Sequence, residues 1–205
     1  PLPRIEDIFD KLKGAKVFSN LDLASGYHQV PLTEAASDAS AFITPEGHFQ
    51  FNVLPFGIHS APPAFQKMME HVLKDCIQQN ICQVYLDDIL VYSKDAEQHK
   101  EHLKRVFSKL DKANLRLRPD KCNFFLYEIE HLGHIIDGQG VRVNPSKVEV
   151  LLKYTRPTTI KALQSFMGLA NYYHKGFATM AVPLFALYKE RVKGKKNSDA
   201  GGSHK

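Results

Sequence analysis

The chain has 205 residues, of which 43% are hydrophobic, so it is long enough for one large domain or for one domain with a small appendage. Its net charge of +5 is uneven: residues 1–95 carry 7 Lys and Arg against 12 Asp and Glu, a net of −5, and residues 96–205 carry 20 against 10, a net of +10. No stretch approaches the ~18 apolar residues of a membrane span, and residues 1–10 lack a signal-peptide pattern, so we expect no membrane partner.

The charge division and the cysteines narrow the class of protein. A basic C-terminal part suits the binding of a polyanion, with metal-binding carboxylates in the acidic part; alternatively, the lysines are the solvated faces of helices. The cysteines are odd in number and share no C-x-x-C spacing: Cys76, Cys82 and Cys122. This pattern argues against a disulfide framework or a zinc knuckle and favours a reducing compartment.

The first elements end close to an acidic residue. Residues 3–12 have apolar side chains at helical spacing and predict a short amphipathic helix. Residues 16–23 predict a mostly buried strand with Asp22 near its C-terminal end. In the turn that follows, we expect Gly26 to supply backbone freedom and Tyr27 to place an aromatic ring near the carboxylate.

Residues 39–76 predict a hairpin, a loop and a helix. Residues 41–43 and 49–53 read as strands around a turn at Pro45-Glu46-Gly47. The loop Leu54-Pro55-Phe56-Gly57 leads to Ser60, which we expect to cap a helix whose apolar stripe extends to Cys76.

Two adjacent aspartates interrupt the apolar, β-branched stretch of residues 83–93. The pattern predicts two strands joined by a hairpin turn at Leu86 and Asp87, with the aspartates at the tip. Two neighbouring carboxylates suit a hard divalent ion such as Mg²⁺, although Asp-Asp is also an ordinary turn dipeptide.

The second half predicts helices and short strands. Asp95 and Gln98 form a capping pair for a helix that extends to about Ala113. Strands are expected at residues 122–126, 131–136 and 141–143. His131 and His134 have metal-like spacing, but a separation of three in one strand would place them on opposite faces.

Two further helices are expected after residue 144, the first capped by Asn144-Pro145 and ended by Pro157. Lys153, Arg156 and Lys161 lie on them and offer a phosphate-contacting surface. Residues 191–205 have no periodicity and predict a disordered basic tail.

The order of elements predicts an α+β fold with a ferredoxin-like antiparallel sheet backed by helices. In that fold the first strand lies beside the aspartate hairpin, so Asp22 would face Asp87. Carboxylates that share two metal ions are a known solution to phosphoryl transfer, although a metal-dependent nuclease would also use them.

Several motifs in order resemble the reverse transcriptase domain of a gypsy-type long-terminal-repeat retrotransposon Pol polyprotein. The matching segments are LDLASGYHQV, AFITPEGHFQFNVLPFGIHSAPPAFQ, VYLDDILVYS, LRLRPDKCNFF, HLGHIID and RPTTIKALQSFMGLANYY. The resemblance implies a polymerase palm with partial fingers in residues 1–143, and a helical thumb with the start of the connection in residues 144–190.

The resemblance also implies roles for individual residues. It implies that Asp22, Asp87 and Asp88 are the catalytic carboxylates, which hold two Mg²⁺ or Mn²⁺ ions with the carbonyl of Leu23. The expected nucleotide-binding residues are Tyr27 as the gate against a ribose 2′-hydroxyl, Phe56, Gly57, Leu86 and Lys121. HLGHIID resembles the primer-grip hairpin, so the expected nucleic-acid contacts are His131, Leu132, Gly133, Lys153, Arg156 and Lys161.

The predicted function is therefore that of an RNA-directed DNA polymerase, which extends a primer on an RNA or DNA template with dNTPs. The family has a fingers hairpin before PLPRI, and this chain begins after it, so we expect impaired activity. The alternative is a catalytically silent nucleic-acid-binding remnant of a Pol protein. The expected setting is intracellular, in a cytoplasmic particle or the nucleus, and no oligomeric state is predicted.

Overall fold

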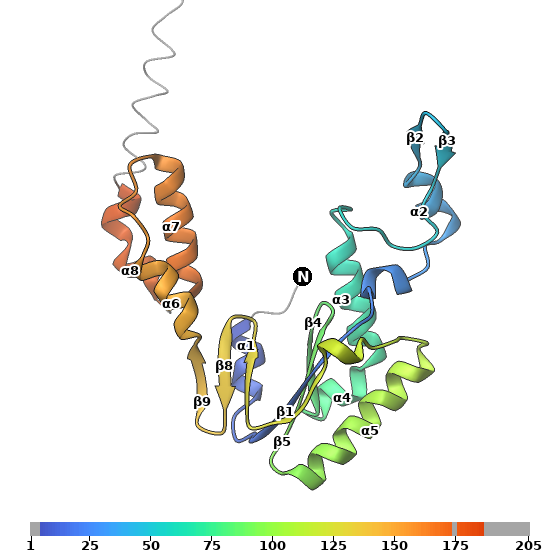
Figure 1. The fold of residues 1–205 in the computed structure, drawn as a ribbon, viewed down its shortest axis with the longest axis horizontal. Coiled ribbons are helices and arrows are strands. Elements are labelled where there is room, and N and C mark those ends of the chain that lie inside the picture. The colour runs from blue at the N-terminus through green and yellow to red at the C-terminus, as the bar shows by residue number, and fades with distance from the viewer. Residues whose placement is uncertain (1–4, 174–175, 187–205) are drawn as a thin grey trace, which may run out of the picture. The chain divides into compact units, whose positions relative to one another are not determined.

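The computed structural model describes residues 5–173 and 176–186, which contain both helices and antiparallel strands (Figure 1). They divide into two compact units, residues 1–142 and residues 143–205, and each is treated by itself. The predicted tail at residues 191–205 lies outside the described residues. Within the described part, no helix is long and apolar enough to cross a bilayer.

The first unit begins with a short helix and contains most of the strands. Its elements are α1 (Ile5–Lys11), β1 (Val17–Asp22), η1 (Gly26–Gln29), α2 (Glu34–Ala39), β2 (Phe42–Thr44), β3 (Gly47–Phe49), α3 (Ala61–Val72), α4 (Lys74–Gln78), β4 (Cys82–Tyr85), β5 (Asp88–Ser93), α5 (Ala96–Lys112), η2 (Pro119–Lys121), β6 (Asn123–Leu126), β7 (Glu128–His131), β8 (His134–Asp137) and β9 (Gly140–Val143).

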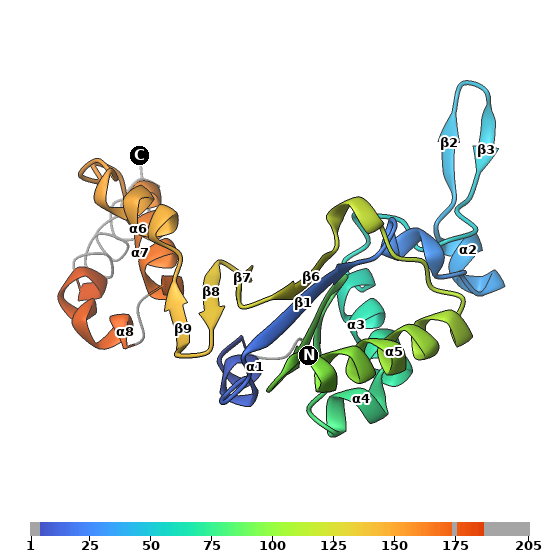
Figure 2. The same cartoon turned by 60° about the horizontal axis from the view of Figure 1, so that its bottom comes forward.

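The central sheet has the strand order β4-β5-β1-β6, and β1 pairs antiparallel with both β5 and β6. The chain passes through α3 between β1 and β4 and through α5 between β5 and β6. This is the ferredoxin-like connection of strands and helices, so the predicted α+β fold is confirmed. Figure 2 shows α3, α4 and α5 together on one side of β1.

The two faces of this sheet are covered differently. The face toward α3 and α5 carries an extended core that includes Leu21, Leu23, Phe65, Met69, Ile89, Val91, Leu103, Val106 and Leu110. A smaller cluster covers only part of the opposite face, where α1 and the β7–β8 hairpin pack: Leu12, Ala15, Phe18, Leu90, Tyr92, Ile129 and Ile136. Since successive side chains of a strand alternate between faces, Asp22 belongs to the second face, with Phe18.

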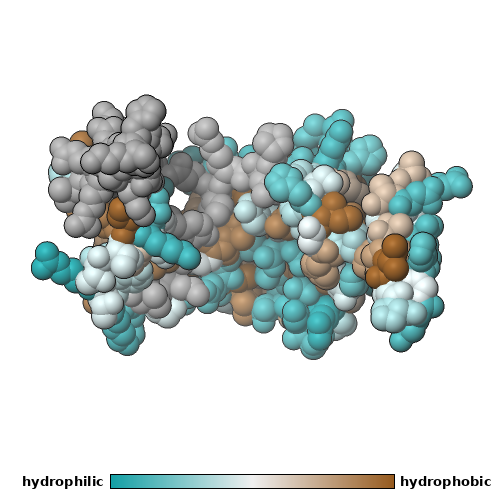
Figure 3. Space-filling view, turned by 90° about the horizontal axis from the view of Figure 1, so that it is seen from above, coloured by the Kyte–Doolittle hydropathy of each residue, from teal (hydrophilic) through white to brown (hydrophobic). Residues whose placement is uncertain are grey.

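The β2–β3 hairpin extends from the sheet and is apolar on its surface. Its strands pair Phe42 with Phe49 around a two-residue turn. The first strand has the predicted length but is shifted by one residue, and the second begins at Gly47 and ends at Phe49 rather than extending over residues 49–53. The rings of Phe42 and Phe51 also lie 5.3 Å apart. Figure 3 shows apolar surface at the right of the view, where this hairpin lies in Figure 1.

The helix predicted to extend from Ser60 to Cys76 is broken near Leu73, where α3 ends and α4 begins. Ser60 precedes α3 as predicted, but its side chain makes no capping hydrogen bond. Asp95 does cap α5, because its carboxylate accepts a hydrogen bond from the Gln98 N–H at 2.8 Å.

The prediction of one strand over residues 131–136 is wrong. Leu132 and Gly133 adopt positive φ angles of 49° and 74° and form a two-residue turn between β7 and β8. His131 and His134 are therefore paired across neighbouring strands rather than placed on opposite faces of one strand.

The second unit contains α6 (Pro145–Leu152), α7 (Ile160–Tyr173) and α8 (Phe177–Met180). Asn144 caps α6 as predicted, through a hydrogen bond from the Ser146 N–H to its side-chain oxygen. Tyr154 donates its hydroxyl hydrogen bond to the Ala162 carbonyl of α7, which holds the connection between the two helices.

Candidate active site

The predicted carboxylates meet where β1 and β5 end. The ladder pairs Val17 with Ser93 at one end and Asp22 with Asp88 at the other. Asp87 lies in the turn before Asp88, as the sequence predicts, but the expectation that Asp22 faces Asp87 is wrong, because the register places Asp88 opposite Asp22. Directly paired residues of an antiparallel ladder project from the same face, so these two carboxylates are neighbours.

This arrangement is electrostatically unfavourable by itself. Burial raises the pKa of Asp88, and the charges of Asp87 and Asp22 raise it further. A hydrogen bond from Asn20 and the charge of Lys121 act in the opposite direction and lower this pKa. The net upward shift means that burial and the neighbouring negative charges disfavour the ionised form of Asp88, which a bound cation would favour.

The donor set fits a hard divalent cation. Asp22 and Asp88 are paired at the end of the sheet with Asp87 next to them in the turn, and the buried side-chain oxygen of Asn20, on the same strand as Asp22, has no hydrogen-bond partner. The Asp22 carbonyl accepts the Arg118 N–H at 2.8 Å on the β6 side, so the next carbonyl, that of Leu23, projects to the β5 side. Within the described residues, no three or more His, Cys, Asp or Glu side chains are already grouped closely enough to hold a metal ion.

A buried glutamine holds the turn that carries Asp87. Leu86 has a φ angle of 57°, a left-handed conformation that is unfavourable for a leucine. Its N–H donates a 2.7 Å hydrogen bond to the side-chain oxygen of Gln66 on α3, and the Gln66 amide donates to the Val84 carbonyl at 3.1 Å. Gln66 is therefore a positioning residue for the turn, and sequence reasoning missed it.

The turn after β1 places an aromatic ring beside these carboxylates. Tyr27 is buried in η1 and stacks on Phe65 of α3, with ring centroids 4.7 Å apart. Burial raises the pKa of Tyr27, and the charge of Asp87 raises it further, which shows that the two side chains are close.

Gly26 is required here for a reason other than the predicted backbone freedom. The positive φ angle in this turn, 51°, belongs to Ser25. A Cβ atom on Gly26 would lie 2.9 Å from Cζ of Phe65 and 3.5 Å from Cβ of Asp87. Gly26 thus provides the space that lets η1 approach both α3 and the aspartate turn.

The remaining predicted nucleotide-binding residues border this site. Phe56 is 67% exposed, and its ring lies 5.1 Å from the ring of Tyr27. Gly57 has a φ angle of 91° with open space around it. Lys121, in η2, is close enough for its charge to act on Asp88.

The predicted nucleic-acid contacts are divided between the units. His131 is 3% exposed, with its Nε2 atom unpaired and its pKa lowered by burial to about 4, which argues against a contact through its ring. Leu132 and Gly133, at the tip of the β7–β8 hairpin, are partly exposed. In the second unit, the predicted contacts Lys153, Arg156 and Lys161 are all exposed. Only Lys161 lies on a helix, α7; α6 ends at Leu152, so the prediction that Lys153 and Arg156 lie on a helix is wrong.

The sequence was compared with known families and proteins. Residues 1–136 match the family described as reverse transcriptase (RNA-dependent DNA polymerase). The chain is 38% identical over 196 residues to the retrovirus-related Pol polyprotein from transposon 297 of Drosophila melanogaster, covering 94% of this chain and 18% of the relative. It is 33% identical over 198 residues to the transposon Tf2-3 polyprotein of Schizosaccharomyces pombe, covering 95% of this chain and 15% of that polyprotein.

Solved structures show the same fold. The foamy viral protease-reverse transcriptase in complex with double-stranded DNA matches with a TM-score of 0.80 and 26% identity, over 93% of this chain and 34% of that one. The foamy viral protease-reverse transcriptase in complex with an RNA/DNA hybrid matches with a TM-score of 0.79, covering 93% of this chain and 26% of that chain. The chain spans less than a fifth of the length of each of these two polyproteins. Because the family match covers more than half of its residues, the chain belongs to the reverse transcriptase family.

Proposed function

We propose that this chain extends a primer with deoxynucleotides on a nucleic-acid template, as an RNA-directed DNA polymerase. The observation that carries the proposal is the pairing of Asp22 with Asp88 beside the Asp87 turn, with Tyr27 close to the same carboxylates. Carboxylates that are bordered by the aromatic rings of Tyr27 and Phe56 suit phosphoryl transfer to a nucleotide.

In this proposal the carboxylates of Asp22, Asp87 and Asp88 and the Leu23 carbonyl hold two Mg²⁺ or Mn²⁺ ions, which the reverse transcriptase family generally uses. When bound, such ions lower the pKa of the attacking primer hydroxyl and stabilise the charge on the leaving pyrophosphate. The chain's own contribution is to hold the carboxylates together against their repulsion, through the β1–β5 ladder and the bond from Leu86 to Gln66.

The neighbouring residues would select and hold the nucleotide. Tyr27 is fixed by its stacking on Phe65, so its ring is a rigid wall that would exclude a ribose 2′-hydroxyl. Phe56 and Gly57 would lie beneath the incoming nucleotide, with Leu86 at the aspartate turn. Lys121 offers a proton donor on the side of Asp88.

The positive charge of the C-terminal part and the similarity to solved structures support a nucleic-acid partner. Residues 96–205 carry a net of +10, and the structurally similar foamy viral enzyme was solved with DNA and with an RNA/DNA hybrid. In this proposal Leu132 and Gly133 contact the primer, and Lys153, Arg156 and Lys161 contact phosphates. Such contacts release counterions, so duplex affinity should fall steeply as salt rises.

Primer extension with Mg²⁺ tests the proposal directly. Asp87→Asn preserves shape but removes a charged ligand, and should lower the extension rate on the order of 10² to 10³-fold. Asp38→Asn, at an exposed position on α2, is the matched control and should leave the rate unchanged.

The same experiment separates the polymerase from the alternative. Salt-dependent duplex binding without any Mg²⁺-dependent extension by the wild-type chain would favour a silent nucleic-acid-binding remnant. Equal extension by wild type and Asp87→Asn would contradict the assignment of the carboxylates.

A further inference from the structure

The chain that follows β1 lies beside residues 116–118, which precede η2 and β6. Leu23 pairs with Leu117 in an antiparallel bridge outside the named strands. Next to this bridge, the Ala24 N–H donates to the Arg116 carbonyl at 2.9 Å. Main-chain pairing therefore extends past the end of β1 as far as Ala24, where the chain turns away into η1.

The side chain of Gln29, the last residue of η1, continues this pairing. Its oxygen accepts the Arg116 N–H at 2.7 Å, and its amide nitrogen donates to the Arg116 carbonyl at 3.0 Å. The carboxamide exchanges two hydrogen bonds with one residue, as a main-chain partner does in an antiparallel ladder. The same nitrogen also donates to the Ala24 carbonyl at 2.7 Å, so both of its protons have an acceptor.

These bonds close the loop that carries Tyr27. The side chain of Gln29 joins one end of the loop to the carbonyl of Ala24 at the other end. Within the loop, Ser25 has the left-handed φ angle of 51°, which costs free energy unless the surrounding structure holds it. Tyr27 is therefore held twice, through its ring by Phe65 and through its main chain by the closed loop.

The location of Gln29 separates this role from a contribution to overall stability. Gln29 is only partly buried, and its two bonds to Arg116 are exposed to solvent. Water competes for such bonds, so they contribute little to the free energy of unfolding. They are directional, however, and together with the bond to Ala24 they fix where one loop lies.

We propose that Gln29 is a positioning residue for sugar selection: its carboxamide fixes the loop that carries Tyr27 and thereby keeps the tyrosine ring where it excludes a ribose 2′-hydroxyl. Gln29 itself contacts no nucleotide in this proposal. The inference rests on the proposed polymerase function and on the role given there to Tyr27. It assigns part of the discrimination between deoxyribonucleotides and ribonucleotides to a side chain that acts through the main chain.

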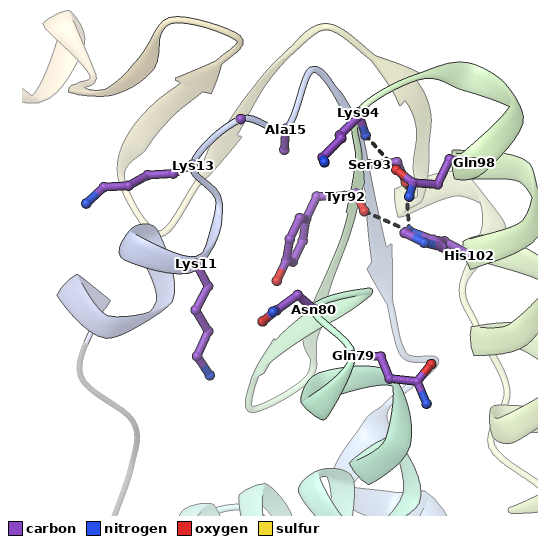
Figure 4. A pocket seen from close by; sticks show the side chains of 11 residues that line it. Lys11, Lys13, Ala15, Gln79, Asn80, Tyr92, Ser93, Lys94, Gln98 and His102 are labelled. Carbon is purple, nitrogen blue, oxygen red and sulfur yellow. Dashed lines mark hydrogen bonds between the residues drawn. The ribbon is translucent and has the colours of Figure 1, made fainter.

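The other end of the β1–β5 ladder offers a matched control. There the side-chain oxygen of Gln98 accepts the Lys94 N–H at 3.0 Å, also at an exposed position (Figure 4). The preceding residue, Ser93, lies five residues along β5 from Asp88, a span of about 17 Å. Gln98→Leu therefore removes a glutamine bond of the same kind far from the carboxylates.

Primer extension by the full chain, with a dNTP and with the matching rNTP, tests the proposal. The ratio of the two kcat/KM values should fall about 10-fold in Gln29→Leu, the lower end of what one steric contact contributes to discrimination. Gln98→Leu should keep the wild-type ratio. In Tyr27→Val, which lacks the ring, adding Gln29→Leu should change the ratio no further, because both residues act through one wall. A purely structural role of Gln29 predicts an equal loss for both nucleotides.

Amide hydrogen exchange gives a readout that needs no activity. In Gln29→Leu the Arg116 N–H loses its acceptor and should exchange faster. The N–H groups of His28 and Val30, which are bonded to carbonyls of the loop at 2.8 and 3.1 Å, should also exchange faster as the loop loosens. The amide of Leu90 on β5 should exchange as in wild type.

The outcomes distinguish this inference from the proposed function. With an active wild type, an unchanged nucleotide ratio in Gln29→Leu would overturn the inference, as would unchanged exchange at His28 and Val30. A further fall of the ratio when Gln29→Leu is added to Tyr27→Val would overturn it as well. Absence of any extension by wild type is a separate failure, which contradicts the proposed function itself and removes the basis of this inference.

Discussion

Polar side chains occur on both faces of the β1–β5 ladder, and the two faces differ in how these groups are satisfied. On the helix face, the buried ring of His99 on α5 lies between two hydroxyls, 2.7 Å from Ser19 and 2.9 Å from Ser93. Ser93 also hydrogen-bonds to His102 at 2.8 Å, and Ser19 accepts the Phe125 N–H at 3.1 Å. Every one of these groups has a partner.

On the opposite face, Gln83 and Tyr92 are hydrogen-bonded at 3.2 Å, but the polar groups beside the carboxylates lack such compensation. The buried side-chain oxygen of Asn20 has no partner, and the pKa of Asp88 is raised by burial and by Asp87 and Asp22. Buried polar groups with partners stabilise a fold, whereas crowded or unpaired ones cost free energy and persist where function needs them. The comparison therefore assigns the helix face to stability and the carboxylate face to chemistry.

The largest expected effect comes from removing one polar group on each face of the ladder and comparing the two variants. Asp88→Asn should lower primer extension on the order of 10² to 10³-fold and at the same time raise the free energy of unfolding by about 1 kcal/mol, because it relieves repulsion. Ser19→Ala should do the reverse, lowering stability by about 1 to 2 kcal/mol and leaving the rate per folded molecule unchanged. Urea unfolding and extension assays of both variants check this, and a less stable Asp88→Asn would break the comparison.

Acid should unfold the chain through its buried histidines. Burial lowers the pKa of His99 and of His131 from 6.5 to about 4. Between these values the unfolded chain binds protons that the folded chain does not, so stability should fall as pH drops through 6.5 and level off near 4. Each histidine should cost about 2 kcal/mol on going from near pH 7.5 to near pH 5.

Two variants separate the histidines. His131 has an unpaired ring nitrogen, so His131→Leu should remove its share of the pH dependence without loss of stability. His99→Leu should remove its share but destabilise the chain near pH 7.5, because Ser19 and Ser93 lose their partner. If the free energy of unfolding depended on pH equally in wild type and in His131→Leu, the role given to His131 would be wrong.

The aspartate turn should depend on Gln66. In Gln66→Leu the partly buried Leu86 N–H loses its acceptor, which should cost about 1 to 2 kcal/mol of stability, and the extension rate should fall because Asp87 is no longer held. Gln29→Leu also removes a hydrogen bond to a main-chain N–H, that of Arg116 at an exposed position, and should cost less. Equal extension rates of Gln66→Leu and wild type would show that the turn keeps its conformation without the hydrogen bond from Leu86 to Gln66.

The smallest effect is expected at Gly26. Gly26→Ala places a methyl group 2.9 Å from Phe65 and should cost about 1 to 2 kcal/mol, with a lower nucleotide affinity as Tyr27 shifts. In Gly138→Ala the nearest atom would be 3.5 Å away, in ordinary contact, so that variant is the control. Equal melting temperatures of Gly26→Ala and Gly138→Ala would contradict the claim that the space at Gly26 is needed.

Local patterns predicted much of the fold. The two-residue turn at Leu86 and Asp87 and the cap at Asp95 follow from turn chemistry and capping, and the structure shows both where expected, whereas the predicted cap at Ser60 makes no hydrogen bond. The resemblance to retrotransposon polyproteins, which the comparisons confirm, supplied the order of motifs.

The remaining features depend on contacts between distant segments. Which aspartate faces Asp22 is set by the register of a ladder, which periodicity does not fix. Gln66 looked like one polar position of an amphipathic helix, and only its bond to Leu86, twenty residues away, reveals its role. The β7–β8 turn was missed because Leu132 adopts a positive φ angle that its residue type does not signal.

The central claim is that the carboxylate face is held ready for divalent cations. Calorimetric Mn²⁺ titration of wild type, Asp87→Asn and Asp38→Asn tests it most directly. The account predicts binding in wild type, at least about 10-fold weaker binding in Asp87→Asn from loss of a charged oxygen ligand, and no change in Asp38→Asn. Superimposable isotherms for wild type and Asp87→Asn would contradict it.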